Sequence, residues 1–180
     1  MKTIIVIEDS IEDLEIINLH CKGFDVYPNA EDERAFFNKL RGNIDKYYCH
    51  SSKNTTQKAM GMINDFMNKH EKIDLFIIDY QLKEGIENGI CNGISFYKDF
   101  IFANEKFCNI PVLFLTRVAD NDIDNDLLSL QDEIIKEGKK IKLLKKTADF
   151  KKESFKKLLR SKINELIGNE DLDINIDKLN

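Results

Sequence analysis

The chain has 180 residues, enough for one domain with a full hydrophobic core, and its length gives no reason to expect a second domain. Hydrophobic residues make up 42% and charged residues 33%, a balance typical of a folded globular protein and not of a disordered one. No run approaches the roughly 20 apolar residues of a membrane span, and acidic residues follow the N-terminal apolar run too soon for a signal peptide. We therefore expect a cytoplasmic protein.

The net charge of -5 hides an uneven distribution. Between Lys136 and Lys162 there are 12 Lys and Arg residues against three acidic ones, so this segment carries +9 and the rest of the chain -14. Such a segment could face nucleic acid or an acidic partner, but a solvated, lysine-rich helix face is the plainer interpretation.

Apolar runs of strand length alternate with helical patterns from the N-terminus onward. The first predicted strand is Ile4–Ile7. Ser10 stands where a helix N-cap belongs, and Asp13, three residues on, resembles the partner of a capping box. The helix that follows ends at Gly23, and residues 24–27 form a short second strand. The apolar stripe of the helix consists of Leu14, Ile17 and Cys21.

The middle of the chain predicts two further helices and the third strand. A helix at 29–40 precedes a polar loop at 41–56, and a second helix at 56–69 carries Ala59, Ile63 and Phe66 on one stripe. Four apolar residues, Leu75 to Ile78, then run directly into Asp79. A strand that ends on aspartate either begins a turn or presents a carboxylate at the edge of a sheet.

The loop after Asp79 has glycines at every fourth position, namely Gly85, Gly89 and Gly93. The remaining predicted elements are a helix at 94–103, a strand that ends on Thr116, a helix at 121–137, a strand at 141–145, a helix at 149–167 and a frayed acidic tail. This order predicts one doubly wound α/β domain at 1–168 with a parallel sheet of five strands. Residues 41–70 form an insertion with an extra helix before strand 3, and 169–180 the tail.

Polar side chains follow the predicted strands at the point where each strand ends. Strand one runs into Glu8 and Asp9, strand three into Asp79, strand four into Thr116 and strand five into Lys145. Parallel strands end at the same edge of a sheet, where such folds bind their ligands. Converging carboxylates stay ionised together only beside a cation, and Mg²⁺ prefers oxygen ligands. A hydroxyl and an ammonium beside it suit an aspartate that attacks phosphorus.

Four strand-end stretches, in order, resemble the receiver domain of bacterial two-component response regulators: IVIED, DLFIIDYQL, IPVLFLT and KLLKK. The resemblance covers roughly residues 2–167. It implies a flavodoxin-like sheet with strand order 2-1-3-4-5. It also implies that Asp79 is the phosphoacceptor, that Thr116 binds the phosphoryl group and relays its arrival, and that Lys145 pairs with that group.

The resemblance further implies a Mg²⁺ site. Asp9 and Asp79 would hold the ion together with the backbone carbonyl of Gln81, and Glu8 would assist through water. The competing interpretation of Asp9 and Asp79 is that both are ordinary caps or turn formers at strand ends.

The sequence departs from the family at three positions. Arg117 follows Thr116, where the family has a small residue; it either restricts small phosphodonors or supplies another phosphate-binding cation. We assign the role of the site lysine to Lys145 and not to Lys146, because Ile141, Leu143 and Lys145 alternate with more solvated positions. With Lys145 as the site lysine, Lys142 stands where the family places an aromatic switch residue, and Lys146 replaces the usual proline.

These features predict a single-domain response regulator that is phosphorylated in a two-component phosphorelay, since only about a dozen residues follow the last helix. Its partners would be a histidine kinase or phosphotransfer protein and a downstream protein target, for which the basic face at 136–162 is one candidate surface. The protein would not be an enzyme beyond catalysing its own phosphorylation and dephosphorylation.

Three other functions compete with this one. The main alternative is a non-phosphorylated receiver-like interaction module, suggested by Arg117, Lys142 and Lys146 and by the enlarged loops at 41–70 and after Asp79. Nucleic-acid binding through the basic segment ranks below it, because the aromatics there fit a core better than stacking platforms. An aspartyl phosphatase is disfavoured because Gln81 stands where its second acid belongs.

Overall fold

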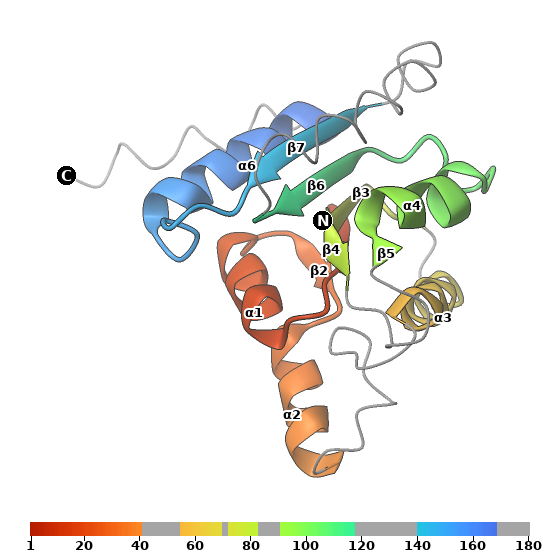
Figure 1. Cartoon of the computed structure of the whole chain (residues 1–180), viewed down its shortest axis with the longest axis horizontal. Helices are drawn as coiled ribbons and strands as arrows, with labels where there is room; N and C mark the ends of the chain where they lie inside the picture. The colour runs from red at the N-terminus through yellow and green to blue at the C-terminus, as the bar shows by residue number, and fades with distance from the viewer. Residues whose placement is uncertain (41–54, 70–71, 83–90, 118–139, 169–180) are drawn as a thin grey trace.

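The computed structural model describes residues 1–40, 55–69, 72–82, 91–117 and 140–168. Five parallel strands form its main sheet, in the order β2-β1-β3-β6-β7 (Figure 1). Their bounds are Thr3–Ile7 for β1, Asp25–Tyr27 for β2, Leu75–Asp79 for β3, Val112–Thr116 for β6 and Ile141–Lys145 for β7. Since β6 and β7 are the fourth and fifth strands of this sheet, the predicted order 2-1-3-4-5 is confirmed.

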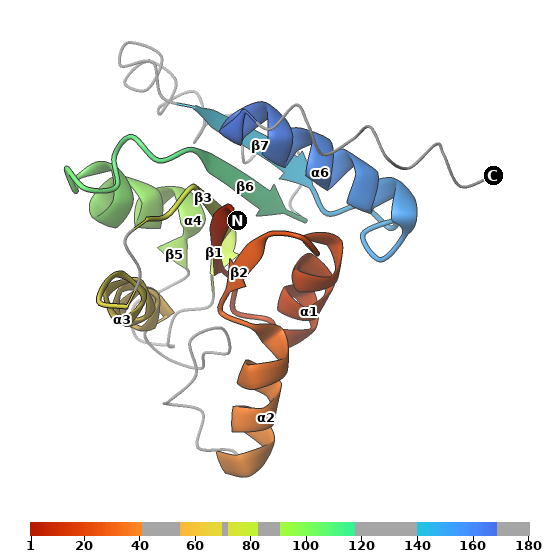
Figure 2. The same ribbon diagram turned by 180° about the vertical axis from the view of Figure 1, so that it is seen from behind.

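Helices cover both faces of the sheet, as the continuous apolar runs of the central strands predict. On one face lie α1 (Ile11–His20) and α6 (Glu153–Ile167); on the other lie α3 (Thr55–Met67) and α4 (Gly93–Phe96). The two views in Figures 1 and 2 agree on this division and show α6 running along β7. The helix α2 is Ala30–Leu40.

Strand side chains alternate between two core clusters. The cluster under α1 and α6, here called the α1/α6 core, contains Ile4, Val6, Leu75, Ile77 and Leu144. The cluster under α3 and α4 contains Ile5, Ile7, Phe76 and Ile78. The insertion helix α3 belongs to this second core, since Ala59, Met62, Ile63 and Phe66 are all buried in it. Because of this alternation, the position of a residue at a strand end determines which of the two faces of the sheet its side chain lies on.

The predicted N-cap of the first helix is present. The backbone N–H of Asp13 donates to the Ser10 hydroxyl oxygen at 3.3 Å. The capping-box expectation for Asp13 is wrong, because the Ser10 N–H donates instead to Glu8 at 3.0 Å. The carboxylate of Asp13 accepts hydrogen bonds from Arg117 and Lys146. The cap thus holds the start of α1 against the end of β1.

The predicted helix at 94–103 is divided between a short α-helix and a π-helix. After α4, the chain continues as η2, Tyr97–Phe102. Before it, β4 (Gln81–Leu82) pairs antiparallel with β5 (Cys91–Asn92), which was not predicted. Gly93 then lies so close to β3 that a Cβ there would be 2.2 Å from the Asp79 carbonyl oxygen. Only glycine fits this approach without displacing the end of β3.

The last predicted helix begins later than expected. Residues 149–152 form turns, and α6 starts at Glu153 after Lys152 as N-cap. It ends at Gly168, whose left-handed φ of 70° favours glycine.

Three predicted features lie outside the described residues: the helix at 121–137, the tail at 169–180 and the centre of the 41–56 loop. Within the ranges that the structure describes, no helix is long and apolar enough to cross a membrane.

Candidate phosphoryl and metal site

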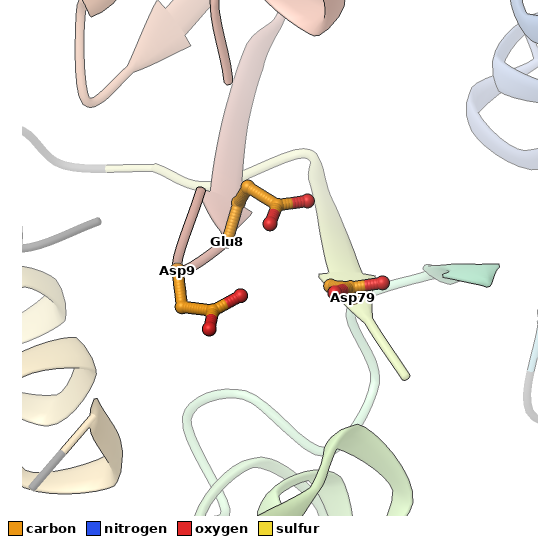
Figure 3. Close-up of side chains that lie close together, drawn as sticks. All are labelled: Glu8, Asp9 and Asp79. Atoms are coloured by element: carbon orange, nitrogen blue, oxygen red, sulfur yellow. The ribbon is translucent and has the colours of Figure 1, made fainter. Parts of the chain in front are cut away.

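Three carboxylates meet at the carboxyl edge of the sheet. Glu8 and Asp9 directly follow β1, and Asp79 is the last residue of β3. One oxygen from each lies within 4.8 Å of the others, and all three residues are buried. Figure 3 shows them grouped at the ends of the two strands. The structure therefore brings together the acidic residues that the sequence analysis placed in a metal site.

The ammonium in this cluster belongs to Lys146. Its Nζ lies 2.6 Å from Glu8, 2.9 Å from Asp13 and 3.2 Å from Asp79, and its side chain is only 1% exposed. The prediction that Lys145 supplies the ammonium is therefore corrected to Lys146.

The alternation of side chains explains the correction. Leu144 packs into the α1/α6 core, so Lys146, two residues on, shares that face. Glu8 continues the alternation of Ile4 and Val6, and Asp79 that of Leu75 and Ile77, toward the same face. Ile141 and Leu143 pack instead against the opposite core, so the stripe that ended on Lys145 faces away from the acids. The more apolar stripe of β7, which ends on Lys145, belongs to the other layer.

Two of the three departures from the family change with this assignment. The residue three positions before Lys146 is Leu143, an apolar residue that is partly buried against the core. Lys142 instead forms an ion pair with Glu165 of α6. Lys146 is no longer a replacement for proline, although Thr147 now follows it where the family has that proline. The departures that remain are Arg117 and the Thr147 that stands in place of the proline.

Burial and mutual repulsion raise the pKa values of two of the clustered carboxylates. Burial, and next the Asp79 carboxylate, raise the pKa of Glu8 to about 8, although Lys146 acts in the opposite direction. Burial likewise raises the pKa of Asp79 to about 6. Burial acts to lower the pKa of Lys146, but the carboxylates of Glu8 and Asp79 outweigh burial and raise this pKa above its ordinary value. A bound cation would relieve this mutual repulsion.

Asp13 is a site residue that the sequence analysis missed. Its carboxylate accepts hydrogen bonds from Lys146 at 2.9 Å and from Arg117 Nη2 at 2.6 and 2.8 Å. These bonds outweigh the effect of burial and lower the pKa of Asp13 below its ordinary value. Asp13 lies four residues before Ile17, on the buried stripe of α1. A carboxylate on an apolar stripe, near the strand-end acids, was the signal available in the sequence.

Thr116 and Gln81 lie at the same edge of the fold. Thr116 is fully buried at the end of β6, and its carbonyl oxygen accepts from the Lys146 N–H at 2.7 Å. Gln81 is exposed at the start of β4 and lines a pocket of about 400 Å³, to which Asp9, Asp79 and Arg117 also contribute. The pocket gives a ligand access to Asp79.

Solved structures of receiver domains resemble this chain over almost its whole length. The Mn²⁺-bound response regulator Rcp1 superposes with a TM-score of 0.59 and 14% identity, over 94% of this chain and 96% of that one. The chain has the receiver-domain fold. The phosphorylated cyanobacterial phytochrome response regulator RcpA gives a TM-score of 0.58 at 14% identity, over 93% and 94% of the two chains.

A signal receiver domain of a histidine kinase from Syntrophus aciditrophicus gives 0.55 at 15% identity, over 98% and 97%. Neither a protein-family model nor a curated protein matches the sequence. The likeness is therefore one of three-dimensional structure.

Proposed function

We propose that this chain is a response-regulator receiver that accepts a phosphoryl group on Asp79 and signals by phosphorylation-dependent protein binding. The observation that carries the proposal is the position of Lys146. Its buried ammonium contacts Asp79 and Glu8, beside three clustered carboxylates. The receiver fold supports the same conclusion, because it places this cluster where α/β sheets bind their ligands.

The donor set fits a hard divalent cation. Three carboxylates within reach of one another, with pKa values of Glu8 and Asp79 raised by burial and mutual repulsion, provide the oxygen ligands that Mg²⁺ prefers. Asp9, Asp79 and the Gln81 carbonyl would hold the ion, and Glu8 would assist through water. When bound, it would neutralise the carboxylates and withdraw charge from the phosphoryl oxygens.

The reaction we propose is transfer from a phosphohistidine of a histidine kinase or phosphotransfer protein. A carboxylate oxygen of Asp79 attacks phosphorus; the new O–P bond forms as the P–N bond breaks, and the imidazole nitrogen leaves with the bonding pair. Lys146, held by Glu8 and Asp13, balances charge on the transferred group. In our proposal, Thr116 binds a phosphoryl oxygen and relays its arrival.

The assignment of Lys146 weakens the main alternative, the non-phosphorylated interaction module. That alternative rests on Arg117, Lys142 and Lys146 and on the enlarged loops. With Lys146 as the site lysine, Lys142 no longer stands at the switch position, where Leu143 now lies. The Asp79 carboxylate also lies 3.2 Å from the Lys146 ammonium, beside Glu8 and Asp9. An interaction surface alone requires no such buried charges, which are costly to maintain.

Nucleic-acid binding receives no support from the described part of the basic segment. Phe150 and Phe155 are 3% and 2% exposed, so neither presents a ring for stacking. Several of its lysines pair with local acids: Lys142 and Lys162 with Glu165, Lys152 with Asp149, and Lys156 with Glu153. A solvated helix face that binds a protein partner agrees better with this arrangement.

The experiment that tests the proposal is a titration with Mg²⁺ and beryllofluoride, a phosphoryl mimic, followed by amide NMR. The wild-type chain should show shifts around Asp79, which Asp79→Asn should abolish. Asp25→Asn, which removes a carboxylate at the start of β2, serves as the control and should respond like the wild type. The proposal fails if the wild type responds neither to beryllofluoride nor to phosphotransfer from its kinase.

A further inference from the structure

Arg117 is held at two points at the mouth of the Asp79 pocket. Its Nη2 donates to both carboxylate oxygens of Asp13, at 2.6 and 2.8 Å. Its guanidinium carbon lies 5.5 Å from the centre of the Phe150 ring. The side chain nevertheless remains 56% exposed and lines the same pocket as Asp79. The group is thus fixed in direction and open to a ligand.

One carboxylate orients both cations of the site. Asp13 accepts from Arg117 and also from Lys146, whose Nζ lies 2.9 Å away and 3.2 Å from Asp79. Phe150 adds a second support, since Lys146 Nζ lies 5.6 Å from the same ring that contacts Arg117. Asp13 and Phe150 therefore hold both cations near each other on the side of the pocket.

The charges of Asp13 and Arg117 compensate one another. Four carboxylates surround the site, namely Glu8, Asp9, Asp13 and Asp79, and the two cations are Lys146 and Arg117. With all six groups ionised, the net charge is -2, which one divalent cation neutralises. If Arg117 were present without Asp13, the net negative charge of the site would be smaller and its attraction for a divalent cation weaker. Because the Asp13 carboxylate offsets its charge, the Arg117 guanidinium lies in the pocket without weakening the attraction for a divalent cation.

We infer that Arg117 is a second phosphoryl-binding cation of this site and that Asp13 is the residue that positions it. A guanidinium has five N–H donors in a planar fork that matches phosphoryl oxygens. The hydrogen bonds to Asp13 come from one of its nitrogens, Nη2. The inference rests on the proposed function, because the ligand is the phosphoryl group carried by Asp79.

The test measures two affinities on the full chain: that of Mg²⁺ alone, and that of beryllofluoride at saturating Mg²⁺. Arg117→Ala should weaken beryllofluoride binding about tenfold, the loss expected for one charge-assisted contact at a half-exposed position. The same variant should bind Mg²⁺ as tightly as the wild type or more tightly, because a positive charge has gone. Arg117→Lys should bind beryllofluoride more tightly than Arg117→Ala and less tightly than the wild type.

Two further variants test the contribution of Asp13 and the effect of breaking an ion pair elsewhere. Asp13→Asn should weaken both Mg²⁺ and beryllofluoride, because it removes a negative charge and releases Arg117. Arg34→Ala breaks a comparable pair with Glu15, between α2 and α1 and away from the pocket. This control should leave both affinities unchanged.

The outcomes distinguish this inference from the proposed function. If the wild type does not bind beryllofluoride, the proposed function falls and this inference with it. If the wild type binds and Arg117→Ala binds equally well, only the inference is overturned. A parallel loss of Mg²⁺ and beryllofluoride affinity in Arg117→Ala would also overturn it, because that pattern indicates a structural role.

Discussion

Replacing Lys146 by methionine removes a buried ammonium while keeping most of the side-chain volume. The ammonium contacts three carboxylates at 2.6, 2.9 and 3.2 Å, and the side chain is 1% exposed. Removing one partner of a buried ion pair costs roughly 3–5 kcal/mol, because the other charge stays uncompensated. We expect about 3 kcal/mol at about pH 8 without Mg²⁺, the lower end of that range. Glu8 and Asp79 can limit the loss by binding protons.

The assay is urea unfolding of Lys146→Met and Lys145→Met beside the wild type, in a metal chelator. Lys145→Met should change the free energy of unfolding by less than about 1 kcal/mol, since its side chain is only half-buried. At about pH 5, the cost of Lys146→Met should shrink. Glu8 and Asp79, with pKa values of about 8 and 6, are then largely protonated in the wild type too. Equal losses for the two variants at about pH 8 would refute the assignment of Lys146.

Three further predictions concern the metal and the backbone around the site. Mg²⁺ affinity should rise from about pH 6 to about pH 8, because Glu8, with its pKa raised to about 8, must lose a proton; a flat calorimetric profile would contradict this. Ser10→Ala should cost about 1 kcal/mol in urea unfolding by removing the N-cap of α1, and an unchanged midpoint would count against the cap. Gly93→Ala should cost roughly 1–3 kcal/mol and weaken beryllofluoride binding, because its Cβ would meet the Asp79 carbonyl. Gly61→Ala, with open space around it, is the control that should do neither.

The stability of the metal-free protein should also fall as pH rises. The folded-state pKa of Glu8 lies above its ordinary value of 4.5, so the folded state binds more protons than the unfolded state between these values. The stabilisation from protonated Glu8 is present below about pH 4.5 and is lost as pH rises toward about 8. Unfolding midpoints in a chelator at several pH values test this, and a rise in stability over the same window would contradict it.

Local patterns in the sequence were sufficient for the sheet and its acidic edge. Apolar runs of four or five residues are typical of strands buried on both faces, and the helical patterns between them favour a parallel sheet. The carboxyl ends of such strands share one edge. The strand order that the resemblance implies sets β1 beside β3, where Glu8, Asp9 and Asp79 lie close together. Ser10 was predictable as a cap, because capping depends only on residues next to it in the chain.

The contacts between elements were decided only by the tertiary structure. Lys145 and Lys146 have the same side-chain chemistry, and only the packing of Leu144 into the α1/α6 core directs Lys146 toward the acids. The sequence indicates a capping role for Asp13. In the folded protein, α1 instead brings the Asp13 carboxylate to Arg117 and Lys146, which follow β6 and β7. The local sequence shows which strands end in charged residues. Which of these charges come into contact depends on the helix layer that each face of a strand packs against, and only the tertiary structure determines that.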